Sequence, residues 1–240
     1  MNLQSTIRFL YPPQCLSCGE ETQTEGAVCG ACWRDLPFIA SLVCDGCGTP
    51  LPGKDTGEPV LCDTCLSDPM PWHKGRAALE YSGTARKLIL ALKHGDRQDL
   101  AGPMATWMMR FLPVLDSENA VIAPVPLHWK RMLRRRFNQA ALIARPIAKK
   151  AHVEYVPDLI CRVRLTRPHE NMSREERFAN QRGAFRVRPR YHGLIRHRPV
   201  ILIDDVMTTG ATLAACSEAC LLADAELVNV LVLARVARTD

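Results

Sequence analysis

The sequence lacks any run of about 18 apolar residues, the length that a membrane-spanning helix requires. Its first stretch, Met1 to Tyr11, also lacks the charged start and long apolar core of a secretory signal peptide. We therefore expect no membrane insertion and a cytoplasmic location. With 240 residues, the chain is long enough for one sizeable domain and one small one.

Basic residues are scarce at the start of the chain and abundant later. Residues 1–70 hold three Lys or Arg against nine Asp or Glu, a balance of −6. Residues 128–198 hold 19 against five, a balance of +14. Such a concentration of cations favours a polyanionic partner, but solvated arginines and contacts to a substrate's own phosphates explain it equally well. Aromatic residues form only 6% of the chain, so few are available to stack on bases.

Cysteine is concentrated near the start, where eight of the 11 lie before residue 66, all in Cys-x-x-Cys pairs. Without an export signal, this pattern indicates metal binding rather than disulfides. Each pair presents two thiolates to one side, and two pairs complete a tetrahedral Zn²⁺ site. Two zinc sites are expected, and they are structural because cysteine fills every coordination position. The predicted ligands are Cys15, Cys18, Cys29, Cys32, Cys44, Cys47, Cys62 and Cys65.

Sequential pairing of these cysteines predicts a double zinc ribbon over residues 1–70, and cross-braced pairing is the alternative. The segment has too few apolar residues for a core, so metal binding must supply much of its folding free energy. Its negative charge repels nucleic acid. We expect it to dock on a protein partner or on the basic face of its own chain.

A stiff break at Pro69–Pro71 predicts a domain boundary, with the second domain over residues 75–240. Strand and helix patterns alternate after the break. Such alternation is typical of an α/β domain, here a largely parallel sheet with helices on both faces. Strands are expected at 75–82, 121–126, 160–163, 184–187, 200–203 and 226–236, and helices at 84–93, 100–111, 139–149 and 213–223.

The most informative stretch runs from Val200 to Thr212. Four apolar residues predict a buried strand that Asp204 and Asp205 close, and a Thr/Gly loop then leads into a helix. Backbone N–H groups at such a helix start bind phosphate, and the carboxylates suit a ribose diol or a water of Mg²⁺. The stretch predicts a ribose 5-phosphate site, with an Asp-rich turn of an ordinary α/β unit as the alternative. The predicted phosphate-binding residues are Thr208, Thr209, Gly210, Ala211 and Thr212.

Two other segments carry polar groups that suit ligands. The strand at 121–126 precedes a basic stretch, which fits a pyrophosphate or a nucleic-acid backbone. Asn138 either caps the next helix or contacts a ligand. Residues 164–183 are polar and nothing in them could form a core, so we predict a flexible loop with a short helix that Ser173 and Glu176 cap. The basic stretch contains Lys130, Arg131, Arg134, Arg135 and Arg136.

The stretch 200–212 resembles the phosphoribosyl pyrophosphate motif of type I phosphoribosyltransferases, and nearly the whole chain resembles the ComF family, including its GntX group. The resemblance rests on the cysteine pairs, on Val125 to His128, on Phe137 to Gln139 and on Gly183 to Phe185. Lys93-His94-Gly95-Asp96 also resembles a turn of this family, although a helix end explains it as well. Arg136 and His169 stand where the family usually has Gly and Gln.

The resemblance implies a type I phosphoribosyltransferase-like fold after a double zinc ribbon, with residues 164–183 as a flexible hood. It implies that Asp204 and Asp205 bind ribose and Mg²⁺, and that residues 208–212 bind the 5-phosphate. The leaving pyrophosphate would be bound by Arg131 and Arg135. Single-stranded DNA would be bound by Lys130, Arg134 and Arg136. Three functions remain open: a DNA-handling protein that binds phosphoribosyl pyrophosphate, a phosphoribosyltransferase for a base or amine, and a non-catalytic nucleotide-sensing regulator. The sequence identifies no catalytic residue and no acceptor.

Overall fold

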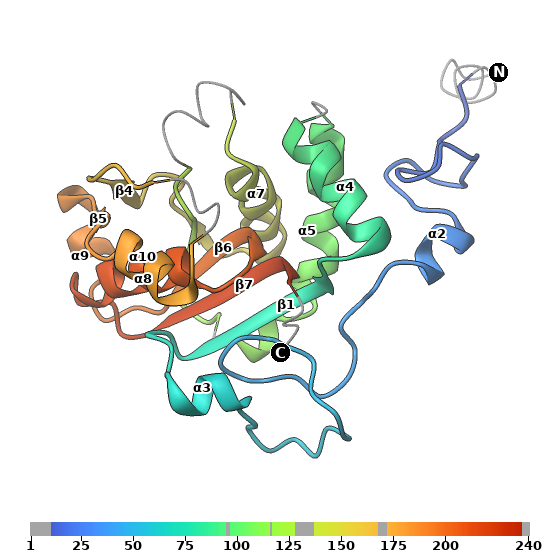
Figure 1. Ribbon diagram of the computed structural model, residues 1–240. Coiled ribbons are helices and arrows are strands. Elements are labelled where there is room, and N and C mark those ends of the chain that lie inside the picture. The colour runs from blue at the N-terminus through green and yellow to red at the C-terminus, as the bar shows by residue number, and fades with distance from the viewer. Residues whose placement is uncertain (1–10, 95–96, 116, 128–136, 168–171, 237–240) are drawn as a thin grey trace.

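Parallel strands form the centre of the molecule in the computed structural model, which describes residues 11–94, 97–115, 117–127, 137–167 and 172–236. Within these ranges a five-stranded sheet has the order β1-β7-β6-β2-β3, with every neighbouring pair parallel (Figure 1). Strand β7 is buried along its whole length, as expected for a parallel sheet covered on both faces. The strands are β1 (Lys74–Glu80), β2 (Val121–Pro124), β3 (Glu154–Tyr155), β6 (Val200–Met207) and β7 (Val228–Arg235).

Alternation of side chains along the central strands builds one apolar layer on each face of the sheet. Ile201 and Ile203 of β6 pack in a core with residues of α4, α5 and α7. Val200 and Leu202 pack in a second core with residues of α10. The helices that supply these cores are α4 (Gly83–His94), α5 (Ala101–Met109), α7 (Gln139–Ala151) and α10 (Ala211–Leu221), and the short 3₁₀ helices η1 (Gln98–Leu100) and η2 (Leu112–Val114) flank α5.

A small antiparallel hairpin, β4 (Ile160–Arg162) with β5 (Phe185–Val187), contacts α10. In the chain, helix α8 (Arg174–Gln181) comes between β4 and β5, and β5 is followed by η3 (Pro189–Tyr191) and α9 (His192–Ile195). From here on we use the name hood for the described residues of this longer segment, 158–167 and 172–191, rather than for 164–183 alone.

Helix α8 begins with the predicted capping box. Ser173 Oγ accepts a hydrogen bond from Glu176 N (3.2 Å), and the Glu176 carboxylate accepts one from Ser173 N (2.7 Å). Two residues of the segment 164–183 nevertheless pack against the rest of the domain. Phe178 packs against the second core, and Gln181 is fully buried.

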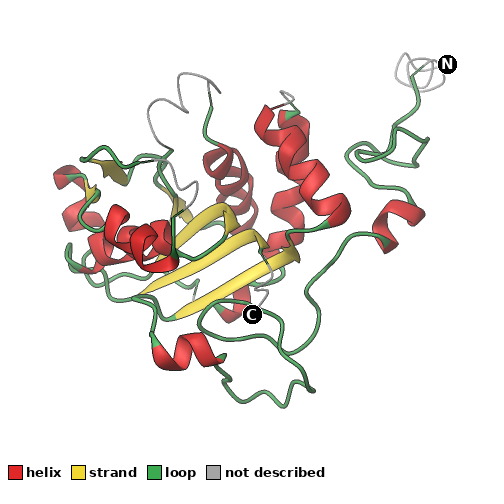
Figure 2. Cartoon of the chain, viewed as in Figure 1, coloured by secondary structure: helices red, strands yellow, loops and turns green. Residues whose placement is uncertain are grey.

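The edge strand β1 is covered by the segment that carries the cysteine pairs. Ile39 N donates to Ala78 O (3.0 Å), Glu80 N donates to Pro37 O (2.9 Å), and Gly75 N donates to Asp45 O (2.7 Å). These bonds occupy backbone groups along an edge that would otherwise be free. Figure 2 shows that this segment is mostly loop, with the helices α2 (Gly30–Arg34) and α3 (Asp63–Ser67).

The predicted architecture is confirmed, with shifts at the ends of elements. Strand β6 continues to Met207 instead of ending at Ile203, because Val206 and Met207 pair with Ala234 and Arg235 of β7. No helix within the described ranges is long and apolar enough to cross a membrane.

Asn138 caps helix α7, as one of the two interpretations predicted. Its Oδ1 accepts from Ala140 N (3.0 Å), and its Nδ2 donates to Val125 O (2.9 Å). We expect Asn138→Ala to lower the free energy of unfolding by about 1 kcal/mol through loss of the cap alone. Denaturant unfolding measures this change. Asn138→Ser keeps an acceptor for Ala140 N but loses the amide group that donates to Val125 O, so it should recover part of the stability. Equal stability of both variants with wild type would contradict the assignment.

Candidate functional site

The proposed site lies at the edge of the sheet where the parallel strands end. Strand β6 leads through residues 208–210 into α10, and β2 leads into residues 125–127. Val125 N donates to Ile203 O (2.9 Å), which holds the segment after β2 beside β6. Ligands of open α/β sheets bind outside this edge of the strands.

Asp204 and Asp205 lie inside β6, so the alternation of a strand directs their side chains to opposite faces. Asp205 Oδ1 lies 3.0 Å from Lys93 Nζ of α4, and both side chains are about 15% exposed. Asp204 is on the side of α10: burial raises the pKa of the Cys216 thiol well above its usual value, and the charge of Asp204 raises it further. The two carboxylates therefore have different neighbours.

The segment 208–212, predicted to bind phosphate, turns sharply from β6 into α10. Gly210 has φ +87°, a left-handed conformation that favours glycine. Helix α10 begins at Ala211, and Ala214 N donates to Gly210 O (2.8 Å). The N–H groups of the first helical residues precede that bond and have no acceptor within the helix. One of them, Ala211 N, has a long contact of 3.4 Å to Thr209 Oγ1.

Arg235, at the end of β7, holds this loop from inside the molecule. Its side chain is 1% exposed, and its Nη1 donates to Met207 O (3.0 Å) and to Thr208 O. In a trans peptide the N–H points away from the carbonyl of the preceding residue. Fixing these two carbonyls toward Arg235 therefore directs the N–H groups of Thr208 and Thr209 away from it.

Sequence reasoning missed the contributions of Lys93 and Arg235. The pattern around Lys93 was matched equally well by an ordinary helix end, and only the fold brings it to Asp205. A weak signal existed for Arg235, because a single cation ends a strand of otherwise apolar or small residues. Buried arginines are rare unless they are paired.

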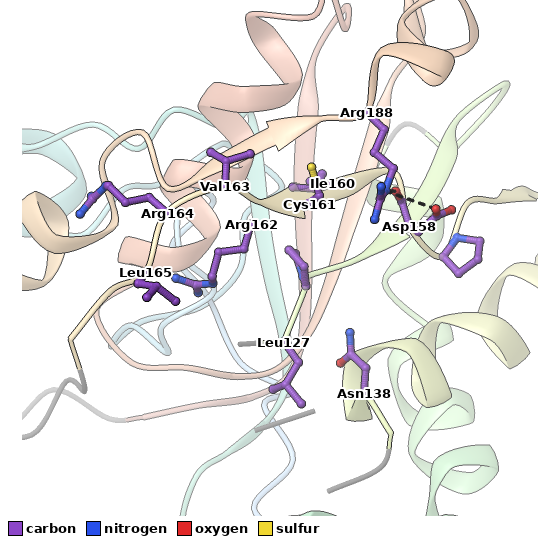
Figure 3. A pocket seen from close by; sticks show the side chains of 12 residues that line it. Leu127, Asn138, Asp158, Ile160, Cys161, Arg162, Val163, Arg164, Leu165 and Arg188 are labelled. Atoms are coloured by element: carbon purple, nitrogen blue, oxygen red, sulfur yellow. Dashed lines mark hydrogen bonds and ion pairs between the residues drawn. The ribbon is translucent and has the colours of Figure 1, made fainter. Parts of the chain in front are cut away.

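A cavity of about 370 Å³ lies between the hood and the segment after β2. Figure 3 shows Leu127 and Asn138 on one side and Arg162 and Leu165 of the hood on the other. Its lining is apolar with a few polar groups, the composition typical of small-molecule sites. The lining residues are Pro126, Leu127, Asn138, Pro157, Asp158, Ile160, Cys161, Arg162, Val163, Arg164, Leu165 and Arg188.

Two cations of the cavity wall are held in place by the hood itself. The Arg162 guanidinium lies 4.4 Å from the centroid of the Phe185 ring, and its Nη1 donates to Thr166 Oγ1 (2.7 Å). Arg188 Nε lies 3.3 Å from the Asp158 carboxylate. The cavity wall therefore combines apolar side chains with two arginines that have partners within the hood.

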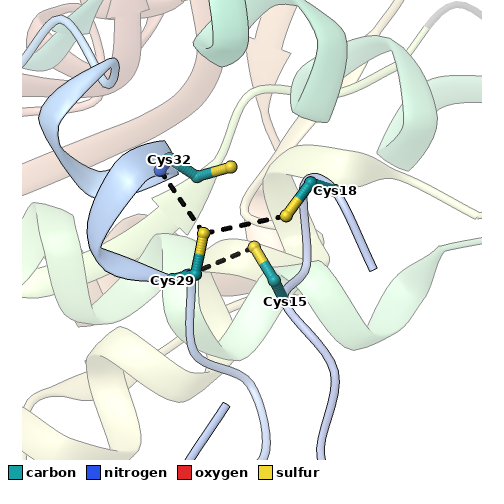
Figure 4. Close-up of side chains that lie close together, drawn as sticks. All are labelled: Cys15, Cys18, Cys29 and Cys32. Atoms are coloured by element: carbon teal, nitrogen blue, oxygen red, sulfur yellow. Dashed lines mark hydrogen bonds between the residues drawn. The ribbon is translucent and has the colours of Figure 1, made fainter. Parts of the chain in front are cut away.

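The cysteine pairs form two clusters in sequential pairing, which confirms the double ribbon and leaves no cross-bracing. In each cluster the four Sγ atoms lie within 4.8 Å of one another, as tetrahedral Zn²⁺ coordination requires. The first cluster is Cys15, Cys18, Cys29 and Cys32, which converge from a loop and helix α2 in Figure 4. The second cluster is Cys44, Cys47, Cys62 and Cys65.

Backbone N–H groups support thiolate at both clusters. Cys29 N donates to Cys15 Sγ (3.2 Å), and Cys62 N donates to Cys44 Sγ (3.3 Å). Burial opposes ionisation of Cys15, but hydrogen bonds from backbone groups outweigh it and lower its pKa to about 6. Hydrogen bonding from Cys44 lowers the pKa of Cys47. The donor set thus fits structural zinc.

The basic stretch lies outside the described residues. This applies to the predicted pyrophosphate contacts Arg131 and Arg135, and to the predicted DNA contacts Lys130, Arg134 and Arg136. His169 also lies outside them. The other predicted ligands, Asp204, Asp205 and residues 208–212, all lie at one edge of the sheet.

Comparisons with known proteins agree with this architecture. Residues 6–70 match the family described as double zinc ribbon domain. The DNA utilization protein YhgH of Escherichia coli O157:H7 is 30% identical over 215 residues, with 87% of this chain and 90% of the relative covered. Competence protein F of Haemophilus influenzae is 26% identical over 213 residues, covering 85% and 89%. Competence protein ComFC of Bacillus subtilis is 24% identical over 193 residues, covering 78% and 74%.

Similarity to solved structures is weaker. The allosteric regulatory enzyme of purine biosynthesis matches with a TM-score of 0.39 and 16% identity, over 60% of this chain and 30% of that one. A protein from Thermus thermophilus matches with a TM-score of 0.35 and 16% identity, over 58% and 85%.

We expect protein purified without chelators to carry two equivalents of zinc, because two complete sets of four cysteines are assembled. Elemental analysis measures this content. Cys29→Ser should retain one equivalent, since it removes a ligand from the first cluster alone. One equivalent or none in the wild-type protein would contradict the assignment.

Proposed function

Because the chain belongs to the ComF family of competence and DNA-utilisation proteins, we propose that it binds phosphoribosyl pyrophosphate with Mg²⁺ at the carboxyl edge of its sheet. The observation that carries this proposal is the junction of β6 with α10. There a left-handed Gly210 and the start of a helix of 11 residues form a cradle for a 5-phosphate.

In this proposal Asp204 and Asp205 have different roles. Asp204 holds the ribose hydroxyls or a water of Mg²⁺, an ion that would neutralise part of the pyrophosphate charge. Asp205 already binds Lys93 at 3.0 Å. Asp205 therefore positions Lys93 near the incoming anion. When no ligand is bound, the Asp205 carboxylate neutralises the charge of Lys93.

We expect Asp204→Asn to weaken binding of Mg²⁺–phosphoribosyl pyrophosphate by about 1–3 kcal/mol, the range for hydrogen bonds to a charged group. Gly210→Val should cost more, because valine is strained at φ +87° and its Cβ would lie 3.0 Å from Cη2 of Trp72. Isothermal titration calorimetry measures both losses.

Asp224→Asn is the matched control for the acidic site. Asp224 is exposed and lies at the opposite edge of the sheet, where the strands begin. Its neighbour Ala225 forms a β-bridge with Arg196, which precedes β6 in the chain. The same change of charge should leave binding unaltered there. If Asp204→Asn binds as tightly as this control does, the proposed site is wrong.

The second proposed ligand is single-stranded DNA, and the surface of the hood supports it. The exposed side chains of the hood include six arginines and the apolar residues Val163 and Leu165. Arginine neutralises phosphates, and its planar group stacks on bases where aromatic residues are few. The exposed arginines of the hood are Arg164, Arg167, Arg182, Arg186, Arg188 and Arg190.

Arg186 is the sharpest probe of DNA binding. It is exposed and pairs across the hairpin with Cys161, so both side chains lie on one face of the hood. We expect wild-type protein to bind oligodeoxythymidylate at about 50 mM salt, with a slope of log affinity against log salt near −0.7 per contacted phosphate. Fluorescence anisotropy over a salt series should show a slope shallower by about 0.7 for Arg186→Ala.

Arg196→Ala is the control for net charge, because Arg196 is exposed but lies near Asp224, away from the hood cavity. It should leave the slope unchanged. Equal effects of both substitutions would show only general attraction, and no binding at low salt would remove the DNA proposal.

The cavity supports a second candidate function, transfer of phosphoribose to a base or amine. Its volume of about 370 Å³ falls within the range of small-molecule pockets. Release of pyrophosphate in the presence of a free base or amine would favour this candidate. Release with single-stranded DNA alone would identify DNA as the acceptor.

A further inference from the structure

Trp72 connects the second cysteine cluster with the phosphate loop, residues 208–212. Its indole Nε1 donates a hydrogen bond to Gly46 O, and Gly46 lies between the ligands Cys44 and Cys47. The other end of the ring lies over Gly210, where an added Cβ would come within 3.0 Å of Cη2. The side chain is 7% exposed, so a buried ring spans the space between the two sites.

The turn that carries Gly46 is fixed from several directions. Gly46 faces Cys65 so closely that a Cβ would lie 3.1 Å from its Sγ. On the other side, its carbonyl oxygen would lie 2.6 Å from a Cβ on Gly75 of β1. Asp45 forms an ion pair with Arg76 of the same strand. The metal cluster, β1 and Trp72 therefore meet at one backbone carbonyl.

The phosphate loop needs such support, because the side-chain contact within it, from Ala211 N to Thr209 Oγ1, is long at 3.4 Å. Arg235 holds its first carbonyls from the inside, and Trp72 covers Gly210 from the other core. We propose that the second zinc centre, through Trp72, positions the phosphate loop, so that metal loss at this centre loosens the loop. The role of the loop in phosphate binding rests on the proposed function. The contacts of Trp72 with Gly46 and Gly210 do not depend on it.

The first cysteine cluster offers a matched comparison. Its segment contacts a different part of the molecule, where Trp33 lies 6.5 Å from Trp107 of α5 between ring centroids and Gly26 lies against Pro103. Among the residues that the structure describes, no hydrogen bond, ion pair or ring contact joins it to residues 207–212. Loss of zinc from this cluster should therefore leave the loop unaltered.

Binding at the loop and metal retention should also be linked in the reverse direction, because a coupling between two sites is reciprocal. Ribose 5-phosphate is a suitable probe, since it needs no Mg²⁺ and tolerates a zinc chelator in the assay. It should slow release of the second zinc equivalent and leave release of the first unchanged.

The test is hydrogen–deuterium exchange of peptides covering residues 207–214, without ligand. Cys62→Ser should exchange there about two- to tenfold faster than wild type, the range for loss of one hydrogen bond, and Cys29→Ser should not. Unchanged exchange in β7 shows that the sheet remains folded. Trp72→Phe removes both the donor to Gly46 O and the Cη2 edge of the indole that lies against Gly210, so it should show the same acceleration with two zinc equivalents bound.

Unchanged exchange of residues 207–214 in Trp72→Phe would overturn the inference, whether or not Cys62→Ser folds. Equal acceleration in Cys29→Ser and Cys62→Ser would overturn it as well, because the effect would not be specific to the second centre. If exchange responds as expected but wild-type protein binds neither ribose 5-phosphate nor phosphoribosyl pyrophosphate, the coupling stands and the proposed function fails.

Discussion

Backbone pairing of β6 with β2 on one side and β7 on the other sets the geometry of the whole proposed site. A parallel strand that slipped by one residue would exchange its two faces, and Ile201 and Ile203 would then leave their core. The same register that buries these side chains directs Asp205 toward α4 and Asp204 toward α10. The apolar part of the strand thus determines where its polar end points.

Charge at the site is balanced by residues from distant parts of the chain. Lys93 reaches Asp205 from α4, and Arg235 reaches the carbonyls of the phosphate loop from β7. Buried charge is costly unless it is paired. Lys93 is paired with a carboxylate, and Arg235 donates hydrogen bonds to backbone carbonyls. An anion entering the loop would meet N–H groups and a helix start without a net excess of carboxylate beside them.

Local signals made much of this structure predictable. The Cys-x-x-Cys spacing identified both metal clusters, and the run Val200–Ile203 identified the central strand. The end of that strand was predicted wrongly because two adjacent carboxylates suggest a loop, whereas pairing with β7 continues to Met207. The packing of Phe178 against the second core was beyond prediction, because isolated apolar residues in a polar stretch give no periodicity. The contacts of Trp72 were beyond prediction, since only the fold brings Gly46 and Gly210 to one ring.

The segment that covers the edge of β1 affects what would happen if the chain were truncated before that strand. The bonds from residues 37–45 occupy one side of that strand, and β7 occupies the other. A fragment that began at residue 74 would present an uncovered strand edge, and two fragments could satisfy each other by joining edge to edge. The cysteine-rich segment therefore protects the sheet against self-assembly, and because Asp45 lies between two ligands of the second cluster, metal loss would uncover part of the same edge.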